Sequence, residues 1–127
     1  CKSAVDRMAR DMALELKPHQ VASFSLWLGL TFTERAQRNL KRQPEMTTQL
    51  VTNPSIGSSV EFPGRIVVAL ANDPQLMQRS GGTFIAAELA QDFGVTDIDG
   101  TIPPSLRAQR GAPIWTPVQE SHESVRR

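Results

Sequence analysis

Two stretches decide the fold class of this chain: SAVDRMARDMALEL at Ser3 to Leu16, and VASFSLW at Val21 to Trp27. Apolar residues recur in the first stretch at helical spacing, which predicts an amphipathic helix. Pro18 ends that helix, because proline cannot continue the hydrogen-bond ladder. The second stretch contains serine as its only polar residue type, which is typical of a strand covered on both faces.

The expected helix has one apolar and one charged face. The apolar face is formed by Val5, Met8, Ala9, Met12 and Leu16, and the charged face by Asp6, Arg7, Arg10 and Asp11. We expect the apolar face to be the buried one. No capping residue precedes this helix, and Lys2 puts a positive charge where the helix dipole favours a negative one. The sequence therefore predicts that this helix is cut at its first residue.

A second helix is predicted over the apolar positions from Ile66 to Ala71, ending at Asn72-Asp73-Pro74. Ser58 and Glu61 have capping-box spacing, so we expect Ser58 to cap it. Pro63 falls where a helix former would be expected, and it suggests a delayed start.

The run TFIAA at 83–87 predicts a second strand, and the segment Glu88 to Phe93 a short helix closed by Gly94. The order helix, strand, helix, strand predicts an α/β fold with a parallel sheet and a right-handed crossover. Two parallel strands do not make a stable sheet. We therefore expect the rest of the sheet to be missing from this sequence.

Two polar segments flank this predicted core. The first, about 33–57, contains Arg35, Arg38, Lys41 and Arg42, and we interpret it as an exposed helical flap with a solvated basic surface. The second, 101–127, contains four prolines and predicts an extended or disordered tail. The expected organisation is thus one domain at 1–100 followed by the tail.

Composition excludes several classes of function. Lys plus Arg number 14 against 13 Asp plus Glu, so a net charge of +1 gives no field to attract nucleic acid. No run is long and apolar enough to span a bilayer, and a single cysteine cannot form an internal disulfide. His19 and His122 have no other ligand at metal-site spacing, so we expect no metal. These features predict a cytoplasmic protein.

Two smaller features have ordinary explanations. Gly81-Gly82 is not a dinucleotide fingerprint and is interpreted as a turn before a strand. Cys1 could be a lipid anchor or an N-terminal nucleophile, but a neutral small residue explains it better, since an amphipathic helix follows at once.

The stretch CKSAVDRMARDMALEL…VASFSLWLGLTFTE resembles the short-chain dehydrogenases/reductases, the SDR family. In that family Tyr-x-x-x-Lys is followed by a helix, a strand, and a Pro-Gly turn with a threonine close after it. The later stretch from Phe62 to Gly100 also looks like the C-terminal region of that family. The resemblance implies the C-terminal part of a Rossmann-like doubly wound parallel sheet, whose N-terminal dinucleotide-binding half is missing.

The resemblance assigns three candidate site residues. Lys2 takes the place of the active-site lysine, which binds the nicotinamide ribose and lowers the pKa of the family's tyrosine. Gly29 matches the glycine of the Pro-Gly turn and Thr33 the threonine that meets the nicotinamide carboxamide or a phosphate, both as cofactor-binding residues. Leu28 replaces the expected proline, which loosens the turn. The tyrosine, the serine and the glycine-rich loop would lie before Cys1.

Two functions follow as hypotheses. In the first, the chain is part of an NAD- or NADP-dependent oxidoreductase that transfers hydride between nicotinamide and a carbonyl or alcohol substrate. The isolated chain is then expected to be inactive. Because the family often pairs through the equivalent helix, the first helix is also a candidate homo-oligomer face. The second is a non-catalytic α/β interaction segment that binds no cofactor, and the absence of tyrosine from this sequence favours it for the isolated chain.

Overall fold

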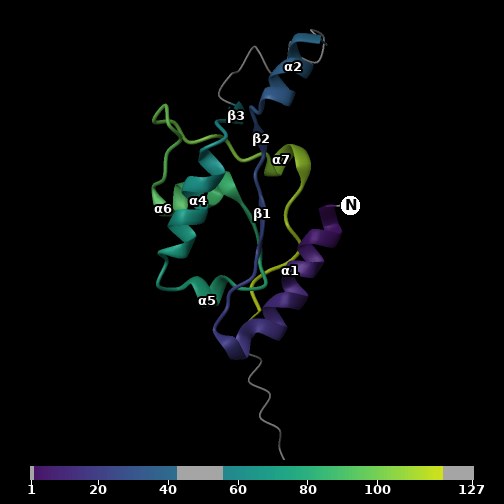
Figure 1. Cartoon of the computed structure of the whole chain (residues 1–127), viewed down its shortest axis with the longest axis vertical. Coiled ribbons are helices and arrows are strands. Elements are labelled where there is room, and N and C mark those ends of the chain that lie inside the picture. Colours follow the sequence, from purple (N-terminus) through teal and green to yellow (C-terminus); the bar gives the residue numbers. More distant parts are fainter. Residues whose placement is uncertain (1, 43–55, 119–127) are drawn as a thin grey trace, which may run out of the picture. The chain divides into compact units, whose positions relative to one another are not determined.

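The structure, a computed structural model, describes residues 2–42 and 56–118 (Figure 1). Cys1, the second half of the predicted flap and the end of the tail lie outside the described residues. The chain divides into two compact units. The first unit comprises Cys1–Ser25, Pro74–Thr83 and Ile114–Arg127, and the second comprises Leu26–Asp73 and Phe84–Pro113.

Helix α1 (Lys2–Leu16) opens the first unit, as the apolar spacing predicts, and the one-turn helix η1 (Lys17–His19) follows it. The predicted buried face is only partly right. Ala9 is buried, but Val5, Met8 and Met12 are exposed, and Asp6 and Ala13 are buried in their place. The two alanines are small enough to let a neighbouring backbone approach the helix closely.

Asp6 is buried because it accepts a hydrogen bond from another segment. The hydroxyl of Ser25 donates to Oδ1 of Asp6 at 2.5 Å, and both residues are buried. A buried carboxyl group is tolerated only where polar partners replace water. The serine of the predicted strand is therefore a partner that stabilises this acidic residue on the buried face of α1.

Ser80 follows helix α5 (Leu76–Arg79) and joins two further segments of the first unit. Its Oγ accepts the N–H of Ser23 at 3.1 Å, and its carbonyl accepts the N–H of Val118 at 2.9 Å. The N–H of Gly81 donates to the carbonyl of Ser23 at 2.7 Å. The N–H of Ser23 is thus bound by the Ser80 hydroxyl and not by a backbone carbonyl of a neighbouring strand. Regular strand structure begins only at Ser25.

The segment around Trp115 is held against α1 by cations. The guanidinium carbons of Arg7 and Arg10 lie 5.7 Å and 5.1 Å from the Trp115 ring centroid. Arg10 also donates to the carbonyl of Thr116 at 2.8 Å. Part of the predicted tail is therefore bound to the first helix through cation–π contacts and a charge-assisted hydrogen bond.

The strands are short. Strand β1 (Ser25–Trp27) pairs with β4 (Thr83–Ile85), and β2 (Leu30–Thr31) pairs in parallel with β3 (Gly57–Ser58), with Leu30 opposite Gly57. The fold class is confirmed as α/β with parallel strands. Strand β4 ends earlier than the predicted Ala87, because helix α6 begins at Ala86.

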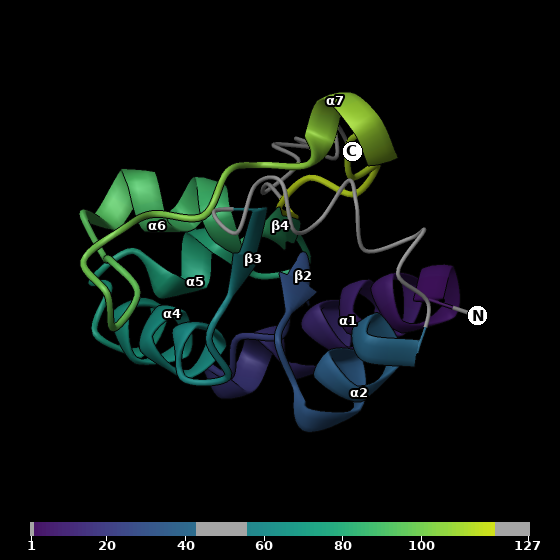
Figure 2. The same cartoon turned by 90° about the horizontal axis from the view of Figure 1, so that it is seen from above.

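Helices α4 (Phe62–Ala71) and α6 (Ala86–Phe93) pack against each other in the second unit and form its core (Figures 1 and 2). Phe62, Ile66 and Leu70 recur one turn apart on α4 and are completely buried. On α6 the residues Ala86, Leu89 and Ala90 are buried, and Gly94 ends the helix in the left-handed conformation, as expected. Burial of these faces supplies the main apolar stabilisation of the unit.

The predicted cap of α4 is wrong by one residue. Ser58 lies in β3 and donates its hydroxyl to the carbonyl of Leu30 at 3.4 Å. Ser59 does the capping, because its Oγ accepts the N–H groups of Glu61 and Phe62, both at 3.2 Å. Pro63 does not delay the helix, since it sits in the first turn, where an N–H has no intrahelical partner.

Asp97 ties the loop after α6 to the start of α4. Its Oδ2 accepts the Ser59 N–H at 2.7 Å, and its Oδ1 accepts the Ser59 hydroxyl at 2.5 Å and the Ile98 N–H at 2.7 Å. Burial alone would raise the pKa of Asp97, but these hydrogen bonds outweigh it and lower the pKa below its usual range. The ionised carboxylate is therefore the form that the fold stabilises.

Two further helices belong to the predicted polar segments. Helix α2 (Glu34–Arg42) occupies the first half of the expected flap, and the short helix α7 (Arg107–Arg110) lies in the segment expected as a tail. Pro103, which precedes α7, is buried. The described part of this segment, up to residue 118, thus contributes both a helix and a buried side chain.

Replacing Asp97 with asparagine should lower the free energy of unfolding by about 2 kcal/mol at about pH 7, because three donors lose an ionised acceptor. The pKa of Asp97 is lower in the folded than in the unfolded chain. The stabilisation is therefore complete above the unfolded pKa of about 3.9, and it is lost as pH falls through the folded pKa. Urea unfolding at several pH values measures the difference.

The control is Asp92→Asn on the exposed side of α6, which should change the free energy of unfolding by less than about 0.5 kcal/mol. A difference between the parent chain and D97N that stays constant down to about pH 3 would contradict the role given to the ionised carboxylate.

Candidate functional site

The turn between β1 and β2 is the centre of the candidate site. It consists of Leu28 and Gly29, and Gly29 has a φ of +77°, in the left-handed region that favours glycine. A Cβ at Gly29 would meet nothing within 4 Å. The requirement for glycine therefore comes from the backbone conformation, and the missing side chain leaves one face of the turn open to a ligand.

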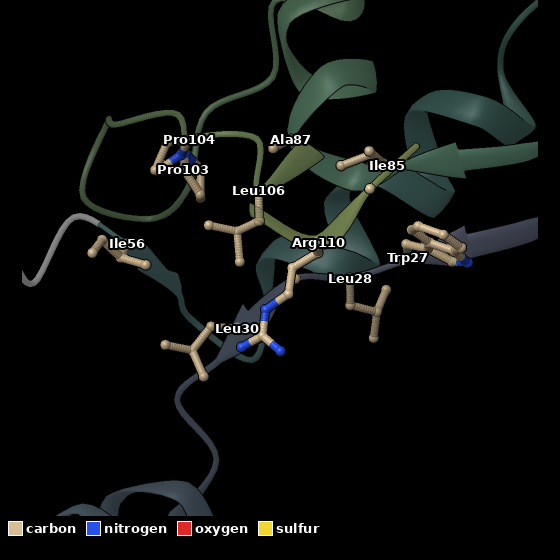
Figure 3. A pocket seen from close by; sticks show the side chains of 12 residues that line it. Trp27, Leu28, Leu30, Ile56, Ile85, Ala87, Pro103, Pro104, Leu106 and Arg110 are labelled. Carbon is tan, nitrogen blue, oxygen red and sulfur yellow. The ribbon is translucent and has the colours of Figure 1, made fainter. Parts of the chain in front are cut away.

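A pocket of about 330 Å³ opens beside this turn, within the second unit. Figure 3 shows its side chains. Its walls are almost entirely apolar, and one arginine is their only charged residue. The lining residues are Trp27, Leu28, Gly29, Leu30, Ile56, Ile85, Ala87, Pro103, Pro104, Leu106, Arg110 and Gly111.

The wall formed by residues 103–111 is anchored by Glu88. Arg107 donates from Nε to Oε1 of Glu88 at 2.8 Å and from Nη2 to Oε2 at 2.5 Å. Ser105 donates its hydroxyl to the same Oε1 at 2.7 Å. The hydrogen bonds from Arg107 lower the pKa of Glu88, so the pair is charged at neutral pH. This bidentate pair fixes α7 and the prolines before it relative to α6.

Gly29 and Thr33 lie in the same unit, at the two ends of a short segment that contains β2. Thr33 is exposed, and its Oγ1 accepts the N–H of Ala36 at 3.2 Å at the start of α2. Its hydroxyl therefore caps this helix and keeps its proton free to donate to an acceptor. Thr33 does not line the pocket.

Lys2 lies in the first unit, as the exposed first residue of α1. The structure therefore brings Gly29 and Thr33 together in one unit, and it places Lys2 in the other. Within residues 2–42 and 56–118, no group of three or more His, Cys, Asp or Glu side chains could hold a metal ion, and no helix is long and apolar enough to cross a membrane.

The sequence interpretation missed the far wall of the pocket. The prolines in this segment indicate an extended tail, and Arg110 belongs to no motif that the sequence displays. One signal was present, because an apolar Leu106 two positions after a proline pair is unusual in a fully solvated segment.

No family model matches the chain. The chain is 40% identical over 103 residues to dehydrogenase/reductase SDR family member 1 of Mus musculus, and 35% identical over 103 residues to the protein of that name from Homo sapiens. The chain is similar to part of a short-chain dehydrogenase/reductase. Each alignment covers 78% of this chain, which spans about a third of the length of these SDR relatives, 33% in each case. The SDR resemblance inferred from the sequence is thus confirmed.

Replacing Gly29 with alanine should destabilise the second unit by about 1–2 kcal/mol, since an L-residue is strained at this φ although there is space for its side chain. Gly64→Ala is the matched control. Gly64 lies in α4, where a Cβ also meets nothing within 4 Å, so this change should stabilise the chain by about 0.5–1 kcal/mol. Opposite signs in urea unfolding are expected, and equal effects would contradict the backbone explanation.

Proposed function

We propose that this chain forms the C-terminal part of an NAD- or NADP-dependent oxidoreductase, which transfers hydride between the nicotinamide and a small carbonyl or alcohol substrate. The observation that carries the proposal is the Gly29 turn, which has a left-handed backbone and opens beside an apolar pocket in a chain similar to the SDR proteins. Lys2, Gly29 and Thr33 are the proposed site residues.

The residues at the turn fit the nicotinamide end of such a cofactor. A flat ring needs close approach to backbone, and Gly29 offers it because no side chain covers one face of the turn. The hydroxyl of Thr33, with its proton free, would donate to the carboxamide or to a phosphate oxygen. The bound cofactor would supply or accept the hydride.

The proposed role of Lys2 is electrostatic. An ammonium group beside a tyrosine favours the phenolate and so lowers the tyrosine pKa, which suits it to proton transfer to or from the substrate oxygen. Lys2 would also bind the nicotinamide ribose through its N–H donors. Because this sequence contains no tyrosine, we propose that the isolated chain is inactive.

Two further parts of the proposal concern partners and location. Val5, Met8 and Met12 form an exposed apolar stripe on α1, which supports pairing of two copies through this helix. A cytoplasmic location is proposed from the single cysteine in the sequence.

A second candidate function is a non-catalytic α/β interaction segment that binds no cofactor. The absence of tyrosine favours it. The coding sequence ahead of Cys1 separates the two candidates. A tyrosine at Tyr-x-x-x-Lys spacing before Lys2, preceded by a glycine-rich βαβ unit, is expected for the oxidoreductase, whereas a stop codon or unrelated sequence there would refute it.

The isolated chain should not bind NADH or NADPH measurably, because the pyrophosphate of such cofactors is held by a glycine-rich loop that this sequence does not contain. Titration with NADH fluorescence as the signal provides the measurement. Micromolar affinity would show that the chain carries a dinucleotide site of its own.

In a protein that carries this chain behind the expected tyrosine, Lys2→Met should lower kcat by about 100-fold or more and shift the pH profile to higher pH. The upward shift follows because the tyrosine loses the cation that lowers its pKa. Lys41→Met, on exposed α2, is the control and should leave both unchanged. A K2M enzyme with the parent rate and pH profile would remove Lys2 from the site.

A further inference from the structure

We propose that the pocket beside Gly29 binds an apolar molecule with a carboxylate at one end, and that Arg110 recognises the carboxylate. This assigns a substrate class to the site and, for the reaction, rests on the proposed oxidoreductase function. The binding itself depends only on residues of this chain.

The shape and lining of the pocket select an apolar body. At about 330 Å³ it lies at the small end of the range for small-molecule sites. Trp27, Leu30, Ile56 and Leu106 present hydrocarbon or aromatic surface to its interior, as Figure 3 shows. Burial of a ligand's methylene groups against these walls would stabilise the complex.

Arg110 supplies the charge that selects an anion. Its side chain extends toward strand β2 in the view of Figure 3, with the guanidinium group between the labelled Leu28 and Leu30. Among residues 2–42 and 56–118, no carboxylate forms an ion pair with it, in contrast to Arg107 on the same short helix, which pairs with Glu88. The guanidinium thus keeps its donors for a ligand.

The position of Arg110 is fixed independently of any ligand. The bidentate pair between Arg107 and Glu88 holds α7 one turn before Arg110, and the N–H of Arg110 donates to the carbonyl of Leu106 at 2.8 Å. A planar guanidinium on a fixed backbone can offer two parallel N–H donors to a carboxylate. Arg110 is exposed to solvent and lies at the rim of the apolar pocket, where a carboxylate can reach it while the apolar part of the ligand lies inside.

Tryptophan fluorescence can test this binding directly. The chain has two tryptophans, Trp27 in the pocket wall and Trp115 in the first unit, so Trp115→Phe leaves Trp27 as the sole reporter. In this background octanoate should change the Trp27 emission in a saturable manner. It should bind about tenfold more tightly than 1-octanol, which has the same apolar body without the charge.

Arg110→Gln should weaken octanoate binding about tenfold and leave 1-octanol binding unchanged. Arg110→Lys keeps the charge but loses the planar pair of donors, so its affinity for octanoate should lie between those of the parent and R110Q. Arg35→Gln, on exposed α2 and away from the pocket, is the matched control and should bind as the parent does. Circular dichroism checks that each variant is folded.

Three results would overturn the proposal. Octanoate and 1-octanol could bind equally, R110Q could bind octanoate as the parent chain does, or inorganic pyrophosphate could bind through Arg110 as tightly as octanoate does. The last result would assign Arg110 to a cofactor phosphate. None of these measurements contains a cofactor, so their failure is distinct from failure of the oxidoreductase function.

In an active protein that carries this chain, the same substitution gives a second readout. Arg110→Gln should raise the KM for an oxo-octanoate about tenfold. It should leave the KM for the methyl ester unchanged, because the ester has no carboxylate for Arg110 to bind. Equal effects on the acid and the ester would contradict recognition of the charge.

Discussion

The carboxylate of Asp97 is the interaction on which the second unit depends. Backbone hydrogen bonds join β2 to β3 and build the helices, but the side chain of Asp97 joins the loop after α6 to the start of α4. Asp97 binds Ser59, and Ser59 also caps α4, so one carboxylate fixes the helix start and the loop together. Because Phe62 begins the buried face of α4, a misplaced helix start would also misplace the core.

Glu88 joins the core to the candidate site in the same way, because its carboxylate accepts hydrogen bonds from another segment. It sits on α6 one turn after buried Ile85, and its two oxygens hold Ser105 and Arg107. The pocket wall is thus attached to the packed core by a few charge-assisted hydrogen bonds and by Pro103, which is buried. The site therefore has a rigid side, made by the strands and the Gly29 turn, and a side held mainly by one ion pair.

The elements that follow from local chain chemistry were predictable from the sequence. Helical spacing placed α1 and α4, and Gly94 marked the end of α6 because a left-handed residue is needed there. Spacing could not say which face of α1 is buried, because that depends on Ser25, a partner distant in the sequence. Ser58 and Ser59 were also indistinguishable by pattern, since pairing of Ser58 with Thr31 decides which of them caps α4. Arg110 was missed for the same reason: its role depends on a fold that brings residue 110 beside residue 29.

The contact at Gly57 has a consequence for how this chain can vary. A Cβ at that position would overlap with the Phe32 ring, so a side chain there collides with an aromatic group that follows β2. In a saturation library position 57 should therefore favour glycine unless Phe32 moves aside or is replaced by a smaller residue. Variants of this chain that keep the fold would therefore keep the glycine at position 57 together with the pairing of β2 with β3.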